Sequence, residues 1–148
     1  MSEADEAEIR AVLVSFFDAM GAWEADCKRL HYQIKNGEVA GDDKFERITA
    51  GFMEVFERFC VLTSKPPKRT FPPDNFVSYY PLRPTYGADL EKIEAVEIAG
   101  NKAIALTQTT PPLLQRYRYE LQRGADGWRI KDNRKVLRTD GKFQAADL

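Results

Sequence analysis

Two tyrosines and one aspartate in the C-terminal part are the residues best suited to acid–base chemistry. Apolar and polar side chains alternate there, so Trp128 and Asp132 share one face of a predicted strand. A carboxylate among apolar side chains has a raised pKa and can act as a general base. Tyr117 and Tyr119 offer hydroxyl donors from the preceding strand. If the chain is an enzyme, its predicted catalytic residues are Asp132, Tyr117 and Tyr119; the structural alternative is that Asp132 only accepts hydrogen bonds.

Other catalytic and metal-binding patterns are missing from the sequence. His31 is the single histidine, and Cys27 and Cys60 are the only cysteines, which is too few for a zinc ligand set at the usual spacing. The same shortage argues against a Ser-His-Asp or Cys-His arrangement, and no glycine-rich phosphate loop occurs. We therefore expect no metal and no cofactor. Each cysteine lies on an apolar helical stripe, which favours two reduced, buried thiols over a disulfide.

Two amphipathic helices are predicted in the N-terminal half. The first carries an apolar stripe with steps of three and four residues from Ile9 to Ile34, and Asn36-Gly37 supplies its stop. The second opens at Asp42-Asp43, and Glu46 lies three residues after Asp43, as in a capping box. Both stripes are rich in phenylalanine, and we expect these rings to fill a core.

The C-terminal half predicts two β-hairpins. Residues 92–99 and 102–109 are joined at Gly100-Asn101, and residues 115–123 and 128–133 flank a turn at Asp126-Gly127. Six of the eight prolines lie between residues 64 and 84, so that segment is irregular, with at most one short edge strand at 76–80. Helices on one face of an antiparallel sheet define an α+β fold, which we expect to form one domain over residues 1–148.

Two groups of residues are suited to binding a protein partner. The proline-rich loop carries Tyr80, Arg83 and Tyr86, which are residue types enriched at interface hot spots. The second hairpin has a polar, basic face on the side opposite Asp132. Its members are Arg116, Arg118, Glu120, Gln122, Arg129, Lys131, Asn133 and Lys135. This face is either ordinary solvated sheet surface or a docking surface for an acidic partner.

Charge is divided unevenly along the chain. The net charge is −6 over residues 1–60 and +5 over residues 61–148, although the whole chain carries −1. An acidic helical half and a pI near 5.9 argue against nucleic-acid binding. No apolar run is long enough to span a membrane, and the acidic N-terminus does not look like a secretory signal. We expect a cytoplasmic protein.

Several segments resemble the bacterial immunity-protein branch of the nuclear transport factor 2-like fold. They are Met20 to Cys27, Phe56 to Cys60, Thr107 to Thr109, Tyr117 to Tyr119 and Trp128 to Asp132. The resemblance runs from about Phe16 to Leu148. It implies a curved sheet wrapped around a cone-shaped pocket, and a small non-enzymatic protein that binds and silences a cognate toxin. The proline-rich middle is longer than this resemblance leads us to expect.

The resemblance leads to two sets of expected site residues. Tyr80, Arg83, Tyr86, Arg116 and Arg118 are the expected toxin contacts. The cone pocket would be lined by Trp23, Tyr117, Tyr119, Trp128 and Asp132. The alternative function is a small-molecule-binding protein, or an isomerase- or dehydratase-like enzyme, that uses this pocket. Dimerisation through the sheet is common in this fold, so a homodimer is a further expected partner state.

Overall fold

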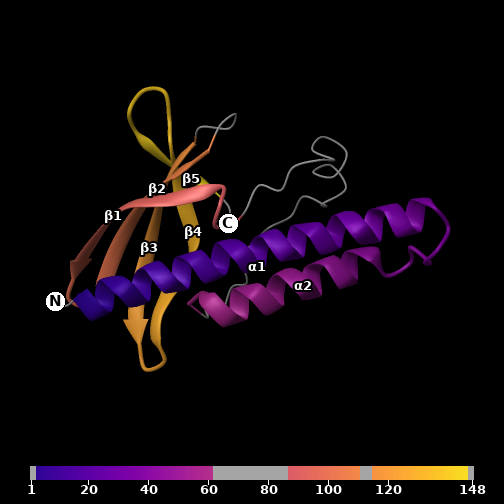
Figure 1. Cartoon of the computed structure of the whole chain (residues 1–148), viewed down its shortest axis with the longest axis horizontal. Coiled ribbons are helices and arrows are strands. Elements are labelled where there is room, and N and C mark those ends of the chain that lie inside the picture. The colour runs from indigo at the N-terminus through magenta and orange to yellow at the C-terminus, as the bar shows by residue number, and fades with distance from the viewer. Residues whose placement is uncertain (1–2, 62–86, 111–114, 147–148) are drawn as a thin grey trace.

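The computed structural model describes residues 3–61, 87–110 and 115–146, and it describes only the backbone at positions 45, 132, 133, 145 and 146. Two helices precede a run of strands (Figure 1). The elements are α1 (Glu3–Lys35), α2 (Lys44–Phe59), β1 (Glu91–Ala99), β2 (Lys102–Thr109), β3 (Arg116–Gly124), β4 (Gly127–Leu137) and β5 (Phe143–Ala146). The predicted edge strand at 76–80 lies outside the described residues. So does the Asp132 side chain.

Both helices form where their apolar stripes predict them. Of the two predicted helix-end signals, the glycine stop of α1 is confirmed and the capping box of α2 is not. The chain leaves α1 through Gly37, whose φ of 76° suits glycine, and the Glu38 N–H donates to the Gln33 carbonyl at 2.9 Å. Asp43 precedes α2, but its side chain makes no capping hydrogen bond. Its φ of −107° and ψ of 19° lie outside the extended region that an N-cap residue needs, so the predicted capping box is wrong.

The two predicted hairpins are confirmed, with one correction. Ala99 pairs with Lys102, so Gly100-Asn101 is the two-residue turn of the first hairpin. In the second hairpin Gly124 pairs with Gly127, so the turn residues are Ala125 and Asp126 rather than Asp126 and Gly127. Gly127 instead begins β4 with a φ of 101°, the left-handed conformation that commonly follows a turn in a bulged hairpin.

The strands form one antiparallel sheet in the order β1-β2-β3-β4-β5. β4 continues to Leu137, beyond the predicted end at 133, and pairs with β5, which the sequence did not predict. One register shift lies between Ile93 and Ala95, and another faces residues 131–133 of β4. Such bulges curve a sheet and re-aim side chains. The predicted α+β class is confirmed.

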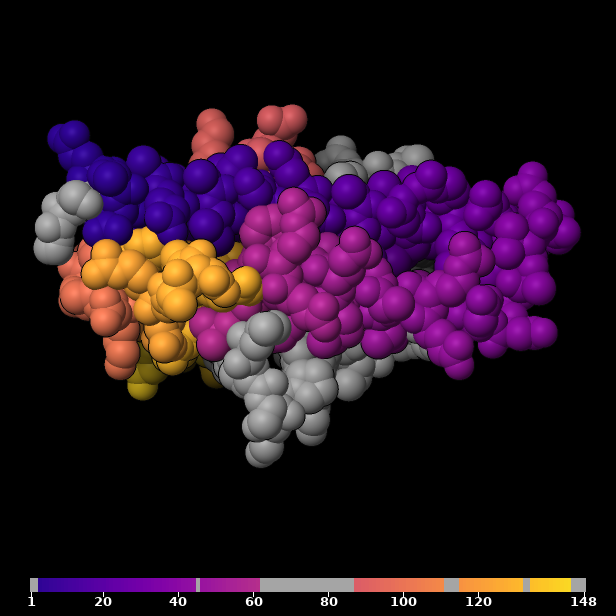
Figure 2. All heavy atoms as spheres, turned by 90° about the horizontal axis from the view of Figure 1, so that it is seen from below, coloured from indigo at the N-terminus to yellow at the C-terminus, as the bar shows by residue number. Residues whose placement is uncertain are grey.

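α1 lies across one face of the sheet, and α2 packs beside α1 (Figures 1 and 2). The chain just after α2 reaches the sheet, where the Val61 N–H donates to the Ile130 carbonyl at 2.7 Å. Half of α1 covers the sheet, and the other half extends beyond it as a hairpin with α2. The core lies between α1 and the inner strand positions. Its fully buried side chains include Phe16, Phe17 and Met20 from α1, and Tyr119, Leu121 and Ile130 from the sheet. Cys27 and Cys60 are buried in this core, as expected, and form no disulfide.

Acidic residues in the first turns of α1 fasten the helix to the second hairpin. The indole N–H of Trp128 donates to Asp5 at 3.2 Å, and the Trp128 backbone N–H donates to Oε2 of Glu8 at 2.8 Å. Arg123 pairs with Asp5 at 3.2 Å and donates to Oδ1 of Asn101 at 3.0 Å. These contacts join segments that are far apart in the sequence, so they hold α1 across the strands.

Candidate functional site

The sheet has an outer face that points away from the helices. The register places Leu106 beside Ala95 and Arg118, and Arg118 beside Lys135. The residues that make up the outer face are Lys92, Glu94, Ala95, Glu97, Lys102, Ile104, Leu106, Gln108, Arg116, Arg118, Glu120, Gln122, Arg129, Lys135, Leu137 and Phe143. The sequence-predicted contact residues Arg116 and Arg118 therefore share this face.

The two predicted contact arginines are only loosely paired. Nε of Arg116 lies 4.0 Å from Glu94, and Nη2 of Arg118 lies 3.9 Å from Glu120. Both distances are too long for hydrogen bonds. Within the described part of the chain, Nε of Arg118 is buried and has no hydrogen-bond partner. Arg118 therefore presents a guanidinium group whose donors are not satisfied by the protein itself.

Apolar side chains adjoin these arginines on the outer face. Ile104 and Leu106 are partly exposed at the centre of the sheet. Phe143 is 37% exposed, and it pairs with Leu137 on the same side as Lys135. Phe143 could not be predicted from the sequence, because its position on this face depends on the pairing of β5 with β4.

Two parts of the predicted basic face are placed differently from expectation. Nη1 of Arg129 donates to the carbonyl oxygens of Glu57 and Cys60 at 2.8 and 3.0 Å, so Arg129 caps the C-terminal end of α2. Lys131 and Asn133 lie in the irregular stretch of β4 that faces Glu120. Tyr80, Arg83 and Tyr86, the expected loop contacts, lie outside the described residues.

A polar cluster around Glu91, here called the Glu91 cluster, is buried on the inner face of the sheet. Glu91 is 3% exposed, and the hydroxyl of Thr107 donates to its Oε2 at 2.5 Å. Tyr119 also hydrogen-bonds to Glu91, and its hydroxyl accepts from Nη1 of Arg134 at 2.8 Å. The Arg134 guanidinium lies 3.8 Å from the ring centre of Tyr117. Burial raises the pKa of Glu91, while Arg134 and the two hydroxyls oppose the shift.

A carboxylate that the sequence did not predict lies beside the two expected tyrosines, while the Asp132 side chain lies outside the described residues. Tyr117 and Tyr119 lie together, with ring centres 6.4 Å apart, and the described carboxylate beside them is Glu91. Arg134 lies an even number of residues after Trp128 and Ile130, so the alternation of side chains along a strand places it on the same inner face. Glu91 likewise precedes Ile93 by two residues. Both residues lie just outside the predicted strands, which covered residues 92–99 and 128–133, whereas β1 begins at Glu91 and β4 continues to Leu137.

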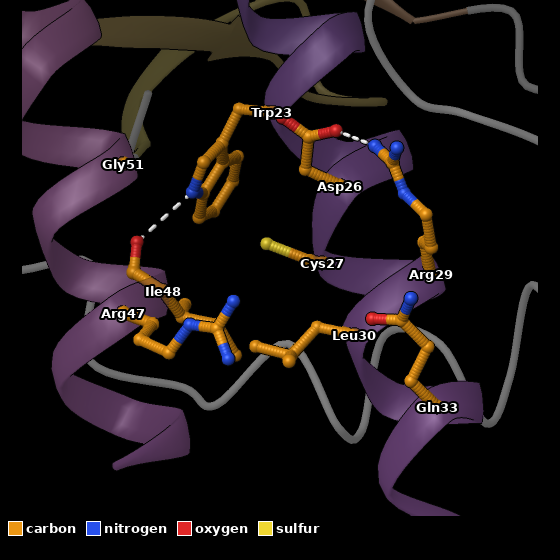
Figure 3. Close-up of a pocket in the computed structure, with 9 residues that line it drawn as sticks. All are labelled: Trp23, Asp26, Cys27, Arg29, Leu30, Gln33, Arg47, Ile48 and Gly51. Carbon is orange, nitrogen blue, oxygen red and sulfur yellow. Dashed lines mark hydrogen bonds and ion pairs between the residues drawn. The ribbon is translucent and has the colours of Figure 1, made fainter. Parts of the chain in front are cut away.

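The two tryptophans expected in the cone pocket lie in separate places. Trp128 contacts the start of α1 through Asp5, whereas Trp23 packs between α1 and α2. The Trp23 indole N–H donates to the Ile48 carbonyl at 2.9 Å, and Gly51 leaves room for the ring. Trp23 also lines a cleft of about 370 Å³ between the helices. Its rim is formed by exposed polar side chains, including Arg29, which is already paired with Asp26 (Figure 3).

The described residues offer no obvious metal site or membrane span. Among residues 3–61, 87–110 and 115–146, no group of three or more histidine, cysteine, aspartate or glutamate side chains is arranged to hold a metal ion. None of the helices in these ranges is long and apolar enough to cross a membrane. The two candidate sites among the described residues are the basic, partly apolar outer face and the buried Glu91 cluster.

Comparison with known proteins identifies the family. Searches of curated proteins and of solved structures found no match. A family model described as "NTF2 fold immunity protein" matches residues 8–146, which is nearly the whole chain. This match confirms the expected fold, and it supports a toxin-neutralising role in general terms. The chain belongs to the NTF2 fold immunity protein family.

Proposed function

We propose that this protein neutralises its cognate toxin by binding it directly and covering the toxin's active surface, without catalysis of its own. The outer face of the sheet is the contact surface, with Arg116 and Arg118 among the contact residues. The observation that carries this proposal is the loose pairing of both arginines beside partly exposed apolar side chains. Tyr80, Arg83 and Tyr86 are proposed to extend the surface from the proline-rich segment.

Growth rescue and co-purification test this function. The toxin domain encoded beside the gene is expressed in a host with and without this protein. We expect rescue by the wild-type chain and a stoichiometric complex that survives gel filtration. Alanine at Arg83, Tyr86 and Arg118 together should reduce both rescue and complex formation, because truncating hot-spot residues costs about 2 kcal/mol or more each. Unchanged affinity in a folded triple variant would refute this assignment of the contact surface.

The Glu91 cluster supports a second candidate function, the binding of a small molecule in the expected cone-shaped pocket. Glu91 is buried, has a raised pKa and lies beside the hydroxyl of Tyr119, which is the chemistry expected of a buried general base. Glu91→Gln separates the two functions. If toxin occlusion is the function, a folded E91Q variant should rescue growth as well as the wild type does, because Glu91 lies on the inner face. If E91Q failed to rescue growth but remained as stable as the wild type, the result would favour small-molecule binding in the cone-shaped pocket as the function.

A further inference from the structure

The outer face carries its charges in an ordered pattern along the strands. Four cations lie towards one end: Lys92, Arg116, Arg118 and Lys135, here called the cationic cluster. The next row along the strands holds Glu97 and Glu120 on either side of Ile104. We propose that the cationic cluster binds an acidic segment of the toxin. The carboxylates of this segment contact the cationic cluster, and an apolar side chain of the same segment lies next to the cluster. This inference rests on the proposed function.

The sheet register brings the cationic cluster together. Arg118 and Lys135 are direct cross-strand partners, and directly opposite residues have Cα atoms about 5 Å apart. Like charges in this position destabilise a sheet unless something neutralises them. Glu94 and Glu120 approach the two arginines only to 4.0 and 3.9 Å, and among the described residues Lys135 makes no ion pair. Carboxylates from a partner would relieve this repulsion.

Arg118 gives the cationic cluster its most specific feature. Its Nε is buried without a hydrogen-bond partner among the described residues, while the side chain as a whole remains 30% exposed. Because Nε itself is buried, a partner can reach only the exposed part of this guanidinium group. Guanidinium groups bind carboxylates through charge-assisted hydrogen bonds. A toxin carboxylate is therefore the group that fits Arg118.

The apolar part of the proposed contact lies next to the cationic cluster. Leu106 is the cross-strand neighbour of Arg118 on β2, and Leu137 follows Lys135 by two residues on the same face. Phe143 pairs with Leu137 and is 37% exposed. Aromatic and arginine side chains together are typical of the energetic centre of a protein interface. The toxin segment should therefore carry an apolar residue close to its carboxylates.

Charge also argues that the occupant is not a second copy of this chain. On the described part of the outer face, basic residues outnumber acidic ones. The basic residues are Lys92, Lys102, Arg116, Arg118 and Lys135, and the acidic residues are Glu94, Glu97 and Glu120; Arg129 is not counted, because it caps α2. Two copies packed face to face would bring two net-positive surfaces together, which is unfavourable. An acidic partner has the complementary charge.

The test measures binding of the purified toxin domain to charge variants of this protein by biolayer interferometry. Arg116→Glu and Arg118→Glu together should raise Kd about 100-fold or more, and Lys135→Glu alone should raise it about 10-fold. Glu97→Lys should increase the association rate about 2- to 5-fold, and raising NaCl from about 50 mM to about 500 mM should slow association of the wild type. Circular dichroism and thermal unfolding confirm that each variant is folded.

Matched variants on the helices control for net charge. Lys35→Glu and Arg47→Glu together change the net charge by the same amount as Arg116→Glu and Arg118→Glu together. Arg47 lines the cleft between the helices. They should alter Kd by less than about 3-fold, because a rim or distant charge contributes little.

If the wild type does not bind the toxin, the proposed function fails. If it binds and the outer-face variants bind equally well, or if the helix variants abolish binding, the acidic-segment inference fails while the function stands. Sedimentation that shows a dimer dissociated by Arg118→Glu would also overturn the inference.

Discussion

Replacing Arg134 with methionine should lower the free energy of unfolding by about 2–4 kcal/mol at neutral pH, because the buried Glu91 loses its nearby cation. Arg134 opposes the burial-induced rise in the Glu91 pKa. The variant also loses the hydrogen bond to the Tyr119 hydroxyl and the contact with the ring of Tyr117. Urea unfolding followed by circular dichroism measures the change.

The effect of Arg134→Met should depend on pH in a defined direction. The folded-state pKa of Glu91 lies above its ordinary value of 4.5, so its contribution to stability is complete below that value and decreases as pH rises through the folded-state pKa. Without Arg134 this pKa rises further, so the penalty should be larger at pH 7 than at about pH 4. Arg138→Met is the control, because Arg138 is 56% exposed and should cost less than about 0.5 kcal/mol. An equal penalty for Arg134→Met at both pH values would contradict the proposed role of Glu91.

Gly127→Ala should destabilise the fold by about 2–4 kcal/mol, through two separate causes. The φ of 101° at Gly127 is unfavourable for any residue with a Cβ atom. A Cβ built there would lie 2.6 Å from Oε2 of Glu8, the oxygen that accepts the Trp128 backbone N–H. The substitution therefore strains the start of β4 and displaces a hydrogen bond that holds α1 to the hairpin.

Gly100→Ala provides the matched control for this prediction. Gly100 also has a positive φ, at 63°, but nothing lies within 4 Å of the position its Cβ would take. Gly100→Ala should therefore lower the free energy of unfolding by only about 1–2 kcal/mol, through backbone strain alone. Thermal and urea unfolding of both variants, and of Gly127→Ala combined with Glu8→Ala, separate strain from the clash. If Gly127→Ala and Gly100→Ala were equally stable, the contact with Glu8 would have no energetic importance.

The helices and the two hairpins could be predicted because their signals are local. The apolar stripe of α1 and the glycine at position 37 act within a few turns of one helix. The turn at Gly100-Asn101 joins strands that are adjacent in the sequence, so its register follows from the turn itself. The second turn was misplaced by one residue, because Asp-Gly also suits a turn whose glycine begins the following strand.

The outer face could be predicted only in part. Alternation in β3 placed Arg116 and Arg118 together on one side of the sheet, and the register confirms that placement. Arg129 was assigned to the same basic surface, but the end of α2 lies close enough to accept its hydrogen bonds. No pattern within β4 could reveal this, because the acceptors come from a different element.

Local patterns were enough to predict the α+β class, the two amphipathic helices, the two hairpins and the side of the sheet on which Arg116 and Arg118 lie. These features depend on periodicity and turn chemistry, which act over a few residues. By contrast, the contacts of Glu91 and Arg134 with Tyr119, and the position of Phe143 on the outer face, could be seen only in the folded chain. These groupings depend on strand pairing and bulges between distant segments, where burial and charge compensation are settled by the whole fold.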